Sequence, residues 1–326
     1  MAEKSATMVE KPAPVAEKST LRLYWELTRI RGFSRETDFT FWSAAIGILL
    51  AARNYEIEPR ALAMTHLWFA IGSTILTAAI CVLNDIFDRD LDGKVERTKN
   101  RPLVTGRIPV LHASLFSAAL MAVPVYMLSY GNTTAFRWGL LGVFPLHFFY
   151  PLMKRVTYWP QAWLGMAINY SLIIAYLTVS KGQFDAHILV LYAGCIAWTI
   201  EYDTIYAYQD IRDDTIIGIK SAAILFGFKY GRMILSGFAA LFWASLFITG
   251  AQNGQGMWFF IISVGGAGLH LVWQLVTWKM EDWDDCSSKF VSNGYLGALI
   301  WLGLLVDYCF KDAAASGFIS KYFEAL

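Results

Sequence analysis

Long runs of apolar residues, separated by short polar stretches, dominate the chain. None of these runs alternates apolar and polar positions as a membrane barrel strand does, and all are too long for a buried strand. Each is instead typical of a helix that crosses a bilayer. The nine runs lie near residues 38–53, 61–83, 108–130, 135–150, 159–180, 187–208, 232–251, 256–278 and 291–310. The pattern predicts an all-α integral membrane protein with nine transmembrane helices in one bundle.

The composition agrees with a membrane protein. Hydrophobic residues make up 56% of the 326 residues and charged residues only 16%, whereas about a quarter of a soluble domain is charged. The formal net charge of +1 provides no general attraction to nucleic acid, so no nucleic-acid partner is expected. The lipid bilayer is the expected surrounding, and no obligate protein partner is predicted.

The N-terminal segment differs from the rest of the chain. Residues 1–20 mix Lys, Glu, Pro and Ala without an apolar run, which predicts a disordered tail before a single transmembrane domain over 21–326. The segment resembles neither a signal peptide nor an acid-poor transit peptide. This favours the endoplasmic reticulum or another endomembrane, with the mitochondrial inner membrane as the alternative.

Basic residues are distributed very unequally between the two sides of the predicted bundle. If the N-terminus is cytoplasmic, the loops on that side carry 21 of the 27 Lys and Arg residues, as the positive-inside rule requires. The densest acidic stretches, at 85–96, 201–214 and 281–285, fall on the same side. We therefore expect the chemistry on the cytoplasmic face.

The first acidic cluster ends the second apolar run. On a continuous helix, Asp85, Asp88 and Asp92 occupy positions i, i+3 and i+7, and Asn84 lies on the same face. Like charges on one face repel each other, and the helix C-terminus also disfavours anions. The arrangement therefore indicates a bound cation.

The second acidic cluster ends the sixth run. Asp203, Asp210 and Asp214 occupy positions i, i+7 and i+11, which predicts another stripe of carboxylates. Two facing stripes would supply the hard oxygen ligands that suit Mg²⁺, which often shares its coordination with substrate phosphates. Either cluster alone could be a solvated acidic cap, but their recurrence on one side favours a metal-diphosphate site. Lys154 and Arg155, just beyond a short run that ends near a proline, could reach such a phosphate.

Five motifs occur in a familiar order. They are Asn84-Asp85-x-x-Asp88-x-x-x-Asp92, Asn100-Arg101-Pro102 with Gly106, Tyr150-Pro151-x-x-Lys154-Arg155, Tyr202-Asp203-Thr204-x-Tyr206-Ala207-x-Gln209-Asp210 with Asp214, and Gly218-x-Lys220-Ser221. Together they resemble the signature of the UbiA-type intramembrane prenyltransferases over roughly residues 21–310. Fungal-type members that act on phenolic acceptors are the nearest in kind.

The resemblance implies a fold and a set of site residues. The fold is a helical bundle around a central cavity, with an isoprenyl diphosphate held through Mg²⁺. The implied metal ligands are Asn84, Asp85, Asp88, Asp92, Asp210 and Asp214. The implied diphosphate contacts are Arg89, Tyr150, Lys154 and Arg155. Arg29 matches the position that meets the acceptor, although Gly32-Phe33-Ser34-Arg35 follows it where relatives often have a turn with Lys-Pro.

The resulting hypothesis is a Mg²⁺-dependent transfer of an isoprenyl group, farnesyl or similar, from an allylic diphosphate to a phenolic acceptor in meroterpenoid biosynthesis. Asp88, Asp210 and Lys154 are the candidate catalytic residues, and Asp203 or the released diphosphate would accept the ring proton. One alternative is the 4-hydroxybenzoate polyprenyltransferase of ubiquinone biosynthesis. A more remote one is a cation-coupled transporter, which would place its acids near the bilayer centre rather than at one interface.

Overall fold

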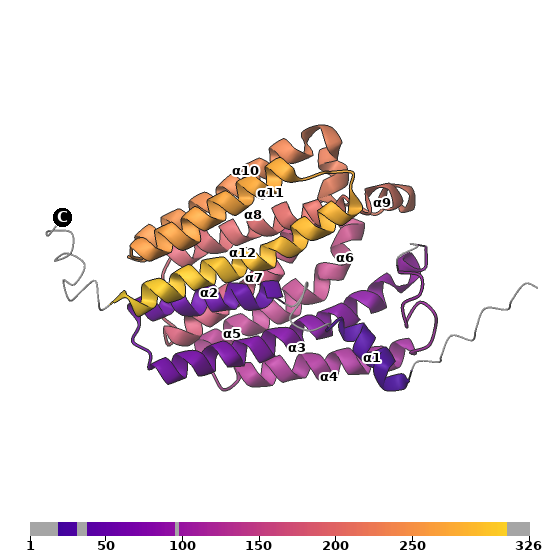
Figure 1. Cartoon of the computed structure of the whole chain (residues 1–326). Coiled ribbons are helices and arrows are strands. Elements are labelled where there is room, and N and C mark those ends of the chain that lie inside the picture. The colour runs from indigo at the N-terminus through magenta and orange to yellow at the C-terminus, as the bar shows by residue number, and fades with distance from the viewer. Residues whose placement is uncertain (1–18, 31–37, 95–97, 312–326) are drawn as a thin grey trace, which may run out of the picture.

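The computed structural model describes residues 19–30, 38–94 and 98–311, and within them every regular element is a helix (Figure 1). The α-helices are α1 (Thr20–Thr28), α2 (Asp38–Asn54), α3 (Pro59–Asp92), α4 (Val110–Leu128), α5 (Thr133–Leu141), α6 (Phe148–Val156), α7 (Pro160–Val179), α8 (His187–Ala207), α9 (Ile211–Ile217), α10 (Ala222–Gln252), α11 (Gly266–Thr277) and α12 (Trp283–Cys309). Two π-helical segments, η1 (Gly142–His147) and η2 (Phe259–Gly265), lead directly into α6 and α11. The predicted all-α fold is confirmed. The tail predicted over 1–20 lies almost wholly outside the described residues.

The predicted number of nine spans is not confirmed. Among the described residues, seven helices are long and apolar enough to cross a membrane. The first predicted span, α2, has only 17 residues. The fourth is interrupted by η1, which contains Pro145, and Pro151 follows inside α6. Proline cannot donate the backbone hydrogen bond that a regular helix needs, so this region changes its helical pitch.

Helix α2 lies in the middle of the bundle, between α7, α12 and α3. Residues 43–52 are buried without a break, so no stripe of this helix is left for lipid. Gly47 allows the closest approach, because a Cβ atom there would overlap the carbonyl oxygen of Leu172 on α7. Small residues at such crossings let two backbones pack directly against each other.

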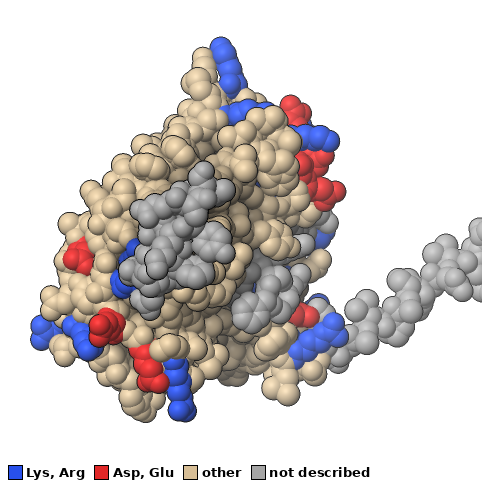
Figure 2. Space-filling view, turned by 60° about the vertical axis from the view of Figure 1, so that its left-hand side comes forward, with Lys and Arg blue, Asp and Glu red and all other residues tan. Residues whose placement is uncertain are grey.

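The outer helices present large apolar side chains to the surroundings. Exposed examples are Leu111 and Leu115 on α4, Met233 and Leu241 on α10, and Leu269 on α11. In Figure 2 uncharged residues cover most of the visible surface, and Lys, Arg, Asp and Glu occur in small groups. These surfaces suit a bilayer, where the apolar helices form an integral membrane protein.

The two ends of the bundle differ in architecture. The C-terminal ends of α3, α6 and α8 lie at one end, together with α1 and α9 (Figure 1). At the other end, buried Asp307 accepts a hydrogen bond from the Gly256 amide at 2.8 Å and pairs with Arg53 at 3.4 Å. Asp185 also lies at this end and accepts hydrogen bonds from the hydroxyls of Tyr55 (2.9 Å) and Tyr176. These contacts join loops to helices, so this end is held by structural ion pairs and hydrogen bonds.

Candidate active site

Three aspartates of the first cluster share one buried face of α3. Because α3 is a single helix of 34 residues that continues to Asp92, the predicted spacing does place Asp85, Asp88 and Asp92 together. Their exposed fractions are only 3%, 6% and 8%. Ionised carboxylates at this depth require compensating charge or hydrogen bonds.

Arginines from two separate segments neutralise this face. Arg29, which caps α1, places Nη2 2.6 Å from Asp85 Oδ1. Arg101, in the loop after α3, places Nη1 3.0 Å from the same oxygen and 2.6 Å from Asp92 Oδ2. The apolar residues Leu27 and Leu103 pack in one cluster with Val82 of α3, so α1 and the loop cover the aspartates as a common layer.

The third cation comes from α6. Lys154 forms an ion pair with Asp88 Oδ2, and Arg155 donates a hydrogen bond to the carbonyl oxygen of Phe87 on α3. The Lys220 amide donates to the Lys154 carbonyl at 2.9 Å, and the Lys220 ammonium donates to the Val156 carbonyl at 3.2 Å. The last turn of α6 is therefore held between α3 and the segment that precedes α10.

Two buried side-chain oxygen atoms on this face have no hydrogen-bond partner among the described residues. Asn84 Oδ1 and Asp88 Oδ1 accept no hydrogen bond from any described residue, although buried acceptors are normally satisfied. No three His, Cys, Asp or Glu side chains of the described ranges lie close enough together to form a ready-made metal cluster. The donor set nevertheless fits Mg²⁺, because amide and carboxylate oxygens are its preferred protein ligands and it keeps several waters.

The second cluster does not form a continuous stripe, so the prediction that Asp203, Asp210 and Asp214 share one helix face is wrong. Helix α8 ends at Ala207 and α9 begins at Ile211. Asp210 occupies the N-cap position of α9, and Asp214 lies in its first turn. Both positions favour aspartate, because the N-terminus of a helix stabilises negative charge.

A cavity of about 180 Å³ lies beside the part of α3 that ends at Asn84. Its polar lining includes Arg29, Asn84, Tyr150 and Asp203, and aromatic side chains such as Phe290 form part of the remaining wall. The structure therefore brings together sequence-predicted residues from α1, α3, α6 and α8. The described residues that line it do not include the α3 aspartates Asp85, Asp88 and Asp92, nor Asp210 and Asp214.

Arg89 also lies away from this cavity. Its guanidinium pairs with Asp90 at 3.0 Å, and the Asp90 side chain is 82% exposed. The role of Arg89 as a diphosphate contact stays a prediction, as do the roles of the other site residues.

A second cavity, of about 60 Å³, adjoins the first at Thr40, which lines both. It follows α3 away from the aspartates, from Leu76 to Trp68, and its walls are mostly apolar. The two cavities together run along α3 from Asn84 to Trp68, which is about 24 Å of helix at 1.5 Å per residue.

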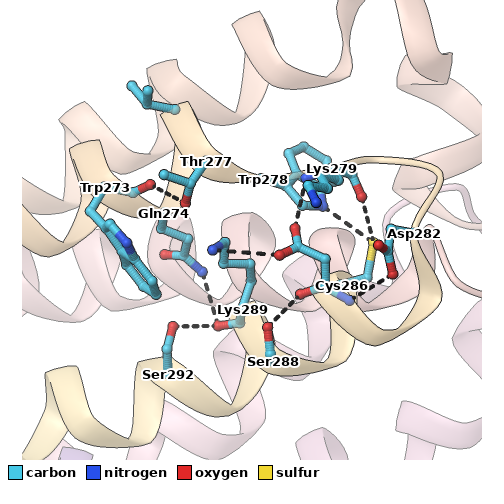
Figure 3. Close-up of polar contacts among 12 residues, drawn as sticks. Trp273, Gln274, Thr277, Trp278, Lys279, Asp282, Cys286, Ser288, Lys289 and Ser292 are labelled. Carbon is cyan, nitrogen blue, oxygen red and sulfur yellow. Dashed lines mark hydrogen bonds and ion pairs between the residues drawn. The ribbon is translucent and has the colours of Figure 1, made fainter.

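The third acidic stretch, at 281–285, has a structural role. The Asp282 carboxylate accepts a hydrogen bond from the Asp285 amide at 3.1 Å and caps α12. Asp285 accepts from the Lys279 amide at 2.7 Å and pairs with buried Lys289 at 3.6 Å. Lys289 also lies 4.0 Å from the centroid of the Trp273 ring (Figure 3). These contacts join α11 to α12 and give Asp282 and Asp285 structural partners.

Sequence reasoning missed two features of the site. Arg101 was recognised as part of a motif, but nothing in the spacing indicates that it binds Asp85 and Asp92. His147 lines the apolar cavity, and its buried Nε2 has no hydrogen-bond partner among the described residues; no sequence signal singles it out from other residues of an apolar run.

Comparison with protein families and curated proteins agrees with this geometry. Residues 40–303 match the model of the UbiA prenyltransferase family. The UbiA prenyltransferase claS of Ampulloclitocybe clavipes is 40% identical over 299 residues, which span 91% of this chain and 95% of that protein. The mitochondrial 4-hydroxybenzoate polyprenyltransferase of Rattus norvegicus is 38% identical over 245 residues, which span 75% of this chain and 64% of that protein.

Solved structures show the same fold. An apo structure of a UbiA homolog from Aeropyrum pernix K1 superposes with a TM-score of 0.71 at 24% identity and covers 83% of this chain and 97% of that one. A UbiA homolog from Archaeoglobus fulgidus bound to GPP and Mg²⁺ gives a TM-score of 0.63 at 17% identity, with 88% of this chain and 99% of that chain covered.

Proposed function

The chain belongs to the UbiA prenyltransferase family, and we propose that it transfers an isoprenyl group from an allylic diphosphate to a phenolic acceptor with the help of Mg²⁺. The observation that carries this proposal is a cavity lined by Asn84, Asp203 and Arg29, the ion-pair partner of buried Asp85, which adjoins a second cavity with apolar walls. The reactants have the same division, because the diphosphate is charged whereas the prenyl chain and the acceptor ring are apolar.

The residues proposed to hold the metal are Asn84, Asp85, Asp88, Asp92, Asp210 and Asp214. Support comes from the unpartnered oxygens of Asn84 and Asp88 and from the Archaeoglobus fulgidus homolog bound to GPP and Mg²⁺. When bound, Mg²⁺ supplies positive charge that lowers the energy of a departing diphosphate.

The chain's own cations act on the same leaving group. Lys154, Arg101 and Arg29 already lie at the aspartate face, where a preorganised positive charge stabilises developing negative charge. Arg155, Tyr150 and Arg89 complete the proposed diphosphate contacts. The allylic C–O bond breaks with its electron pair on the diphosphate, and the cavity walls exclude water from the allyl cation.

The acceptor ring then completes the reaction. An electron-rich ring carbon donates its electron pair to the allylic carbon and forms the new C–C bond. The ring proton leaves to the Asp203 carboxylate or to the released diphosphate, and aromaticity returns. Arg29 is the proposed partner of an anionic group of the acceptor; its position in the cavity lining, next to Asp85, supports this role.

The proposed product is a prenylated phenolic natural product, with a farnesyl or similar donor. The match to the claS prenyltransferase, which spans nearly the full length of both chains, supports the prenyl transfer. This role implies an endomembrane enzyme whose active-site face is cytoplasmic. The rat enzyme supports a second candidate, the polyprenylation of 4-hydroxybenzoate in the mitochondrial inner membrane.

The proposal is tested with membranes that carry the full chain, prenyl diphosphates from C10 to C20, and a panel of phenolic acids, with products identified by mass spectrometry. Asp88→Ala and Asp210→Ala should abolish transfer, and EDTA should abolish it in the unsubstituted chain. Asp90→Ala is the matched control, because Asp90 is exposed on the same turn of α3 as Asp88. If Asp88→Ala turns over as fast as Asp90→Ala, the metal-site assignment fails. If no allylic diphosphate gives a product, a cation-transport function gains support.

A further inference from the structure

His147 is a buried polar residue inside the apolar part of the bundle. It ends the π-helical segment η1, directly before α6, and is only 4% exposed. The segment packs tightly, because a Cβ atom on Gly142 would lie 2.5 Å from the Tyr170 ring. π-Helical insertions in an α-helix are frequent at functional sites.

The hydrogen bonds of the imidazole define its chemical state. Nδ1 lies 2.9 Å from the Gly142 carbonyl oxygen, and a carbonyl only accepts, so Nδ1 carries the hydrogen. A charged ring would be costly in this apolar environment. The neutral ring therefore has a bare lone pair on Nε2, and this buried nitrogen has no hydrogen-bond partner among the described residues.

Two of the hydroxyl groups in the cavity wall already donate to backbone carbonyls. His147 lines the 60 Å³ apolar cavity. The Ser73 hydroxyl in the same wall donates to the Ala70 carbonyl, and the Ser171 hydroxyl donates to the carbonyls of Thr40 and Ile168. A buried acceptor that stays unpaired costs free energy, so a hydrogen-bond donor inside the cavity would be bound selectively.

We infer that His147 accepts a hydrogen bond from the hydroxyl group of the phenolic acceptor and thereby selects and orients it. This inference rests on the proposed function. The proposed reaction has two organic substrates. The prenyl chain of the diphosphate is a hydrocarbon without a hydrogen-bond donor, whereas the phenol donates through its hydroxyl group. His147 is thus a positioning residue that distinguishes a free phenol from its ether or from an unsubstituted ring.

The position of His147 is compatible with this role. It lies seven residues before Lys154, which is about 10 Å of helix, and three residues before Tyr150 of the polar cavity. The two cavities meet at Thr40. A phenol whose hydroxyl reaches His147 therefore keeps its ring on the apolar side of the diphosphate site, where water is excluded.

Two substitutions of His147 test the roles of its two ring nitrogens separately. His147→Asn keeps an N–H at the position of Nδ1 for the Gly142 carbonyl but has no atom at the position of Nε2. His147→Gln places an amide oxygen near the position of Nε2. The probes are phenol and anisole, which differ only in the hydroxyl hydrogen and its replacement by a methyl group. Binding to the purified full chain is measured by calorimetry in detergent.

We expect the unsubstituted chain and His147→Gln to bind phenol about tenfold more tightly than anisole, and His147→Asn to bind the two equally. In the enzyme assay, His147→Asn should raise KM for the phenolic acid about tenfold and leave KM for the diphosphate unchanged. Equal affinities in the unsubstituted chain, including no binding of either probe, overturn the inference, as does an unaltered preference in His147→Asn. If His147→Asn does not fold, the phenol and anisole affinities of the unsubstituted chain and of His147→Gln still test the inference. A chain that prefers phenol but transfers no prenyl group contradicts the proposed function and not the role of His147.

Discussion

Arg101 Nη1 lies 2.6 Å from Asp92 Oδ2, although the two residues belong to a loop and to the end of a helix. The same nitrogen is 3.0 Å from Asp85 Oδ1, two helical turns away. One guanidinium therefore pairs with two buried carboxylates at once, and it ties the loop that follows α3 to the face of the helix that carries them. Because both acids are deeply buried, removal of their partner costs more than removal of one partner of a surface ion pair.

Removal of that guanidinium should destabilise the protein. We expect Arg101→Ala to lower the free energy of unfolding by about 2 kcal/mol, because two buried carboxylates lose a shared partner. Part of the loss should return when Asp92→Asn is added. Thermal unfolding in detergent measures both effects. Arg107→Ala, on an exposed position of the same loop, should leave the melting temperature unchanged, and identical melting of the two single variants would refute the expectation.

Lys154 should contribute to substrate binding through its charge. Lys154→Met keeps a side chain of similar length but removes the ammonium group, so we expect kcat/KM for the prenyl diphosphate to fall about 100-fold. Lys154→Arg should retain part of the activity. The comparison variant is Lys229→Met, whose lysine is exposed on α10 and lies over the Tyr230 ring. A loss of the same size in Lys229→Met would argue against a specific role for Lys154.

The crossing of α2 and α7 should tolerate no side chain at Gly47. A Cβ atom there would overlap the Leu172 carbonyl oxygen, and a backbone atom cannot rotate away. We expect Gly47→Ala to destabilise the fold by about 3 kcal/mol, measured as loss of folded protein on heating in detergent. Gly237→Ala introduces the same methyl group into an exposed position of α10 with open space around it and should be neutral. If both variants melt alike, the two helices do not pack at van der Waals contact.

Asp185 lies at the end of the bundle opposite the 180 Å³ cavity. Its carboxyl group should make the free energy of unfolding depend on pH. The hydrogen bond from Tyr176 lowers the pKa of its carboxyl; burial acts in the opposite direction, and the bond from Tyr55 lowers it further. A pKa that is lower in the folded than in the unfolded state stabilises the protein above the unfolded value of about 3.9. This stability is lost as the pH falls through the folded value.

The melting temperature measured between pH 3 and pH 7 checks this prediction. Asp185→Asn should melt at a lower temperature than the unsubstituted chain at pH 7, and the difference should shrink below about pH 4. Glu56→Gln, at an exposed position, serves as the control and should leave the profile unchanged. A difference for Asp185→Asn that stays constant over the whole range would show that its ionisation does not contribute.

The sequence predicted those features that depend on a local repeat. The shared face of Asp85, Asp88 and Asp92 follows from their spacing, because α3 continues through the motif without a break. The end of α8 could not be predicted in the same way. Hydropathy does not indicate that α8 ends at Ala207 and that Asp210 occupies the N-cap position of a separate helix, so spacing on one continuous helix does not predict how Asp203, Asp210 and Asp214 are arranged.

Features that depend on contacts between distant segments could not be predicted from the sequence either. An apolar run does not reveal whether lipid or protein surrounds it, so α2 resembled an ordinary span although its residues 43–52 are buried by other helices. The pairing of Arg101 with Asp85 and Asp92 depends on how a loop folds back. The unpartnered nitrogen of His147 depends on the π-helical segment and on the cavity beside it.

The burial of α2 has a consequence for how the protein is assembled. This helix enters the membrane early in synthesis, yet two of the helices that enclose it are α7 and α12, which begin at residues 160 and 283. Its final neighbours therefore exist only when nearly the whole chain has been made. Until then α2 is covered by lipid or by other insertion partners, and these must be displaced as the last helix arrives. Completion of the bundle is thus a late, long-range step, and a chain truncated before α12 would leave its central helix without part of its enclosure.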